Sequence, residues 1–84
     1  MKKAIDIMTR EEFDKCGPVT KELIRSLNEP TELWLVYPVE PMKQFGSMCY
    51  YMINTAMDDA AIMSAATGVT WRFKRVKVDP SFIH

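Results

Sequence analysis

The clearest structural signal in the chain is residues 32–39, where apolar side chains occupy both sides of an extended segment. Alternate positions of a strand point to opposite faces. One face carries Leu33, Leu35 and Tyr37, and the other carries Trp34, Val36 and Pro38. Prolines at positions 30 and 41 bracket the segment, as is typical of strand boundaries. The pattern predicts a central strand that is covered on both faces or that contacts a partner chain.

Before this strand, the pattern predicts two short helical pieces. Residues 3–8 alternate only partly, which is consistent with either a short strand or a flexible lead-in. Thr9 and Glu12 have the spacing of a capping box, so a helix is expected to begin after Thr9. Gly17 ends this piece and Pro18 suits the first position of a second one. Its expected apolar stripe is Val19, Leu23, Ile24 and Leu27.

Residues 41–67 give the longest helical pattern. Apolar residues recur there at steps of three and four. One row is Phe45, Cys49, Met52, Ala56, Ala60 and Met63, and an adjacent row is Tyr50, Ile53, Met57 and Ala61. Gly68 is a suitable C-terminal stop. Gly46 is unfavourable inside a helix by about 1 kcal/mol, which leaves open a start closer to Ser47.

Residues 69–78 predict a last strand. Trp71 and Phe73 have one parity, whereas Val76 and Val78 have the other. A β-bulge at residues 74–75 would bring all four to one face, because one extra residue reverses the later side chains. Residues 81–84 are expected to be a tail.

These elements predict a small α+β fold, with residues 1–84 as a single domain. The order is (β)αβαβ, with about three strands and two helices packed on one face of the sheet. Such an arrangement leaves the other face open. Dimerisation or partner docking would then stabilise it.

Composition argues against several classes of function. The chain of 84 residues has 48% apolar residues and no uninterrupted apolar run long enough for a membrane span. Its N-terminus lacks the apolar segment of a secretory signal, so we expect a cytoplasmic protein without a membrane partner. Cys16 and Cys49 are expected to be free, buried thiols.

No group of residues in the sequence forms a recognisable catalytic site. The single histidine, His84, is terminal, and a catalytic imidazole must be held in place by its surroundings. Asp58 and Asp59 diverge by about 100° on a helix, so they do not form a convergent pair. We therefore expect a protein that is not an enzyme and that holds neither a cofactor nor a metal.

The leading functional hypothesis comes from the width of the apolar sector over residues 41–67. Core filling explains most of its methionines, but two adjacent apolar rows exceed what one sheet face needs. The hypothesis is a non-enzymatic protein-interaction module, as a homodimer and as a small inhibitor or adaptor of phage or accessory type that binds a larger protein machine. A subunit of a larger assembly is a third option. The proposed partner-binding residues are Tyr50, Tyr51, Met57 and Asp58.

The alternative hypothesis is a small nucleic-acid-binding regulatory module. Cations that track phosphates and aromatics that stack on bases are the usual means of holding single strands. The residues concerned are Trp71, Arg72, Lys74, Arg75 and Lys77. The simpler explanation is an edge strand whose cations prevent aggregation and whose aromatics face the core. We favour that explanation.

The neutral net charge of the chain conceals two oppositely charged parts. Residues 1–67 hold seven cations and ten anions, whereas residues 68–84 hold four cations and one anion. The parts therefore carry −3 and +3. Such polarity can drive association between copies of the chain.

Overall fold

A computed structural model describes residues 5–83 of the chain, apart from the side chains of the last two of these. It contains a four-stranded mixed sheet in the order β1-β4-β2-β3. The strands are β1 (Asp6–Ile7), β2 (Thr31–Pro38), β3 (Met48–Tyr50) and β4 (Trp71–Val78). The helices are α1 (Arg10–Asp14), α2 (Pro18–Arg25) and α3 (Ile53–Thr67), with a 3-10 turn, η1, at Pro80–Ile83.

The central pair of the sheet is formed by β2 and β4, which run antiparallel. Their register is continuous from Thr31 opposite Val78 to Pro38 opposite Trp71. The expected bulge at residues 74–75 is therefore wrong. The parity changes along β4 because both faces of the sheet are covered. Trp71 and Phe73 point to one face, and Val76 and Val78 point to the opposite face, where a different core lies.

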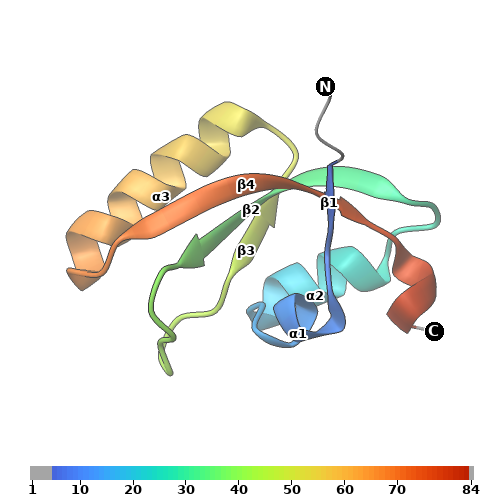
Figure 1. Ribbon diagram of the computed structural model, residues 1–84, viewed down its shortest axis with the longest axis horizontal. Coiled ribbons are helices and arrows are strands. Elements are labelled where there is room, and N and C mark those ends of the chain that lie inside the picture. Colours follow the sequence, from blue (N-terminus) through green and yellow to red (C-terminus); the bar gives the residue numbers. More distant parts are fainter. Residues whose placement is uncertain (1–4, 84) are drawn as a thin grey trace.

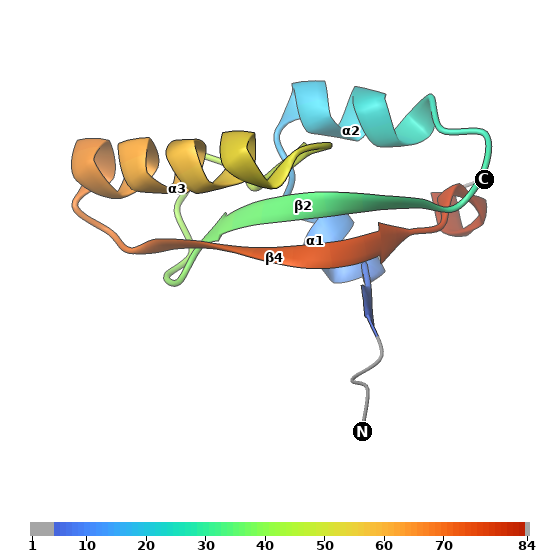
Figure 2. The same cartoon turned by 90° about the horizontal axis from the view of Figure 1, so that it is seen from above.

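Both faces of the sheet are covered, by different helices at different ends. α1 and α2 lie on one side of β2 and β4, and α3 lies on the other (Figure 1). α2 and α3 also lie toward opposite ends of these strands (Figure 2). The mixed α+β class is confirmed, with β3 as a fourth strand, but the expected placement of both helices on one face is wrong. This arrangement explains why β2 is apolar on both sides.

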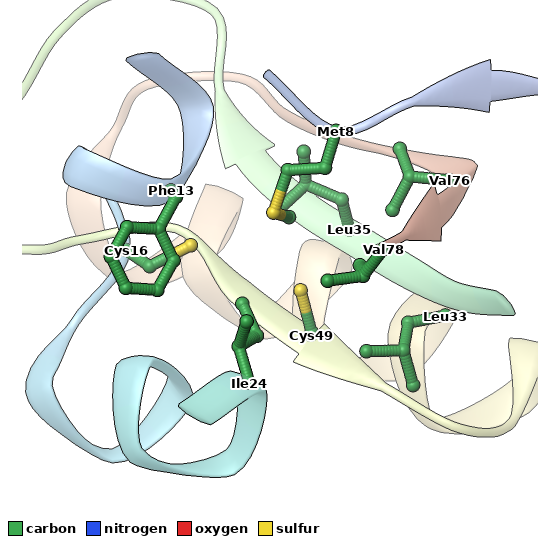
Figure 3. Close-up of a cluster of buried hydrophobic side chains, with 9 residues drawn as sticks. All are labelled: Met8, Phe13, Cys16, Ile24, Leu33, Leu35, Cys49, Val76 and Val78. Carbon is green, nitrogen blue, oxygen red and sulfur yellow. The ribbon is translucent and has the colours of Figure 1, made fainter. Parts of the chain in front are cut away.

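The first hydrophobic core lies between the sheet and helices α1 and α2 (Figure 3). Phe13 from α1 and Ile24 from α2 pack there against the sheet. The sheet and the segments beside it contribute Met8, Cys16, Leu33, Leu35, Cys49, Val76 and Val78. Burial of Leu33 and Leu35 agrees with the face predicted for them.

The second core lies between the opposite face of the sheet and α3. Val36 and Trp71 are buried there against Ala56 and Ala60. The small alanine side chains let the helix approach the strands closely. Half-buried residues complete this core: Trp34, Met42, Met48, Tyr50 and Met63. The Trp71 indole N–H donates to the Thr67 hydroxyl at 3.0 Å, which joins the end of α3 to the start of β4.

The N-terminal helices begin as the sequence predicts. The Thr9 hydroxyl accepts from the Glu12 amide at 3.1 Å, and Glu12 Oε1 accepts from the Thr9 amide at 3.0 Å. This is the expected capping box. Pro18 is the first residue of α2. Of the predicted apolar stripe, Ile24 is buried, but Val19 is 85% exposed.

The predicted helix over residues 41–67 is correct only from Ile53 onward. Residues 41–47 form a loop, and β3 follows it and pairs with β2. Cys49 opposite Leu35 joins the first core, whereas the flanking Met48 and Tyr50 face the second. In this short segment, pairing with β2 outweighs the helical spacing of the apolar residues, so the segment forms a strand. Gly68, with φ of 75°, ends α3 as expected.

The expectations for residues 3–8 and for the tail over residues 81–84 lie partly outside the described residues. Strand β1 occupies the end of the stretch 3–8 and pairs in parallel with β4. Residues 1–4 and His84 are outside the description. Residues 80–83, expected to belong mostly to a tail, form the turn η1.

Candidate interaction surface

The outward side of α3 is mostly apolar, although it is exposed. Ala56 and Ala60 define the side that faces the sheet. Residues about half a turn away define the opposite side, which we call the helix face. It consists of Asn54, Asp58, Ala61, Ile62 and Ala65, all of them exposed. Ile62 is 63% exposed, and Asp58 is the only ionisable residue of this face.

Three of the four predicted partner-binding residues are exposed. Tyr51, in the turn before α3, is 60% exposed, and Met57, on the flank of the helix, is 47% exposed. Asp58 lies at the centre of the helix face and is exposed. The structure therefore leaves these three available for contact.

Tyr50 differs from the other three because it belongs partly to the second core. It lies on β3 opposite Trp34 and is half-buried. Its hydroxyl contacts Met48 Sδ at 3.5 Å. Burial, and then the negative charge of Asp59, raise the pKa of the Tyr50 hydroxyl. Tyr50 thus helps to hold α3 on the sheet.

Beside α3, one end of the same sheet face has no helix over it. We call this surface the open sheet end; it consists of Glu32, Trp34, Phe73, Arg75 and Lys77. The rings of Trp34 and Phe73 lie 6.1 Å apart, and Phe73 is 36% exposed. Arg75 Nη2 lies 3.1 Å from Glu32 Oε2. The open sheet end therefore combines an aromatic pair with a basic margin.

The residues of the nucleic-acid alternative do not share one surface. Trp71 is buried under α3. Arg72 and Lys74 point to the face that α1 and α2 cover, whereas Arg75 and Lys77 point to the face of α3. Trp71 faces the core as expected, but Phe73 is exposed together with two cations. The alternation of β4 thus divides the predicted site into two parts.

Lys74 forms the best-connected ion pair of the described residues. Its Nζ lies 2.9 Å from Glu12 Oε2 and 3.9 Å from Asp6 Oδ2, and it stands over the Tyr37 ring. Burial alone would raise the pKa of Glu12, but hydrogen bonds from Lys74 and Thr9 outweigh it and lower that pKa. The bond to Glu12 raises the pKa of Lys74. One carboxylate therefore caps α1 and anchors it to β4.

We expect Glu12→Gln to reduce stability by about 1 kcal/mol at pH 7, because it removes the charge but keeps an acceptor for the cap. A carboxyl group whose pKa is lowered by folding stabilises the fold at pH values above its ordinary pKa of 4.5. This contribution is lost as the pH falls through the folded-state pKa. The difference between wild type and variant in urea unfolding should therefore disappear toward pH 3. Glu11→Gln on the same helix is the control. A difference that stays constant with pH would contradict the ion-pair explanation.

A cleft of about 550 Å³ opens between the loop over residues 39–47 and the connection from α1 to α2. Charged and aromatic side chains line it, among them Glu12, Lys15, Tyr37, Lys43 and Phe45. Cys16 also lines it, and its thiol donates to the Glu12 carbonyl at 3.4 Å. Both cysteines are buried free thiols. The neighbouring Cys16 sulfur, and then burial, raise the pKa of Cys49, so its thiol stays protonated at neutral pH.

Three exposed apolar residues around α3 are not among the predicted partner-binding residues. Met52, Ile53 and Ile62 are all more than 40% exposed. The signal was present in the sequence, because Ile62 lies outside both predicted apolar rows. An apolar residue that neither row accounts for indicates apolar surface beyond the side of α3 that packs on the sheet.

Within the described part of the chain, no helix is long and apolar enough to cross a bilayer, and no three metal-binding side chains gather into a group. Comparison with protein-family models, with curated proteins and with solved structures finds no match for this chain.

Proposed function

We propose that this protein is a non-enzymatic protein-interaction module that binds through the helix face and the adjoining residues Tyr51 and Met57. The observation that carries the proposal is the apolar character of an exposed helix side. α3 is apolar on the side that packs on the sheet and largely apolar on the side that faces solvent. A helix that is hydrophobic all round is normally buried. A protein partner would supply the missing cover.

The make-up of this surface suits a protein contact. Tyr51 offers a large rigid ring with a hydroxyl, which interfaces favour. Met57 has a flexible side chain that adapts to irregular surfaces. Asp58 gives the mostly apolar helix face a single charge, which can select a basic partner surface. A chain of this kind can act as a small inhibitor or adaptor by covering part of a larger cytoplasmic protein.

The test is a double variant, Tyr51→Asp with Met57→Asp. Both side chains are largely exposed, so the variant should keep its fold, which circular dichroism and thermal unfolding check. We expect partner capture to fall by about tenfold or more, because two charges would enter an apolar contact. The measurement is quantitative mass spectrometry after affinity purification of the tagged full-length protein from its native host.

The matched control is Val19→Asp with Phe45→Asp. These residues are also exposed and apolar, but they lie on the side of α1 and α2. Loss of a stoichiometric partner from the α3 variant alone supports the proposal. A partner that both variants retain, or that only the control loses, shows that binding uses another surface and contradicts it.

A further inference from the structure

The helix face of α3 and the open sheet end both expose apolar side chains, and they carry charges of opposite sign. The helix contains two acidic residues and no basic one, and Asp58 is the one at the centre of the helix face. Among the described residues, Asp58 has no salt bridge. The open sheet end exposes Arg75 and Lys77 on the same strand face, and Glu32 pairs with Arg75 rather than with Lys77. Asp58 on the helix face and Lys77 on the open sheet end are therefore charged residues of opposite sign for which the described part of the chain supplies no salt bridge.

The helix face and the open sheet end cannot contact each other within one chain. The helix face points away from its own sheet, because Ala56 and Ala60 occupy the opposite side of α3. The open sheet end lies beside α3 on the same face of the sheet. The helix face of a second molecule can reach it. A two-fold arrangement makes this contact twice, since each copy donates one helix and one sheet end.

We infer that the partner of the helix face is a second copy of this chain, whose open sheet end receives it. In this dimer, Ile62 and the neighbouring alanines pack on Trp34 and Phe73, and Asp58 lies against Lys77 of the other copy. Each α3 is then covered on both sides, which accounts for its apolar outward side. The inference rests on the proposed function and names the occupant of the same surface.

The test exchanges the two charges. Asp58→Lys sets like charges against Lys77, and Lys77→Glu sets like charges against Asp58. We expect each single variant of the purified full-length protein to raise the dimer dissociation constant about tenfold or more. The double variant Asp58→Lys with Lys77→Glu restores opposite charges and should return the constant to within about threefold of wild type. Sedimentation equilibrium over a range of concentrations measures all four.

Glu11→Lys is the matched control, because it makes the same charge change at an exposed position of α1. It should leave dissociation unchanged. A wild-type protein that stays at the monomer mass of 9.7 kDa at every concentration overturns the inference. A dimer that neither single variant weakens, or that the double variant fails to restore, also overturns it. A monomer whose α3 variant still loses its cellular partner would leave the proposed function intact.

Discussion

Replacing Leu33 with alanine should reduce the free energy of unfolding by about 2–5 kcal/mol, the range found when a large buried aliphatic side chain is truncated. Leu33 has no solvent exposure and lies in the core beneath α1 and α2. A domain of this size has a small margin of stability. The variant should therefore unfold at a much lower urea concentration, measured at one fixed protein concentration.

The informative comparison is with Val36, which lies three residues further along β2 and points to the other face. It is also fully buried, but in the core beneath α3. Val36→Ala should cost about 2 kcal/mol, because the loss of two methyl groups leaves a smaller cavity. Glu32→Ala, which removes only a surface ion pair, should cost less than about 1 kcal/mol. A harmless Val36→Ala would mean that α3 does not cover this face.

This pair of positions shows what the sequence can predict and why. Apolar residues on both sides of β2 indicate two covered faces, and that expectation is correct for Leu33 and Val36. The same reasoning failed for β4, where a change of parity was explained by a bulge. A sequence shows which residues avoid water, but not which helix shields them. Two helices at opposite ends of opposite faces produce the parity of Trp71 and Val76 without any bulge.

The segment before α3 shows a different limit. Cys49 fits both a helical row and the inward position of a strand, because three residues are too few to distinguish the two periods. Pairing with β2 decides the outcome, and that contact is not local in sequence. The capping box at Thr9 and Glu12 was predictable because all of its atoms belong to neighbouring residues. Local chemistry is readable from the sequence, and nonlocal pairing of short segments is not.

The candidate surface was predictable to a similar degree. The exposure of Met57 and Asp58 follows from their helical spacing relative to Ala56 and Ala60. Tyr51 precedes α3, so helical spacing does not account for its exposure. The half-burial of Tyr50 depends on β3, so it could not be predicted from a helix over residues 41–67. The open sheet end was also missed. The contact between the Phe73 and Trp34 rings depends on the register of β2 and β4, and these two residues are 39 positions apart in the sequence.

Gly46→Ala is expected to destabilise the protein by about 1–3 kcal/mol, as overpacking of a tight contact does. A methyl group at this position would lie 2.6 Å from the Gly17 nitrogen and 2.9 Å from the Lys15 carbonyl oxygen. Both are backbone atoms, so no flexible side chain can move aside. The two segments are also joined by hydrogen bonds from Gly17 N to Ser47 O at 3.0 Å and from Ser47 N to Lys15 O at 2.9 Å.

The matched control for Gly46 is Gly17→Ser in the facing segment. A side chain there meets no atom within 4 Å, and Gly17 is the N-cap of α2, where serine is favoured. Urea unfolding should therefore show a loss for Gly46→Ala and little change or a small gain for Gly17→Ser. Equal stability of the two variants would mean that the loop over residues 39–47 does not pack on the α1–α2 connection. The contrast follows from the space around each glycine, because an added Cβ meets backbone atoms at Gly46 and no atom within 4 Å at Gly17.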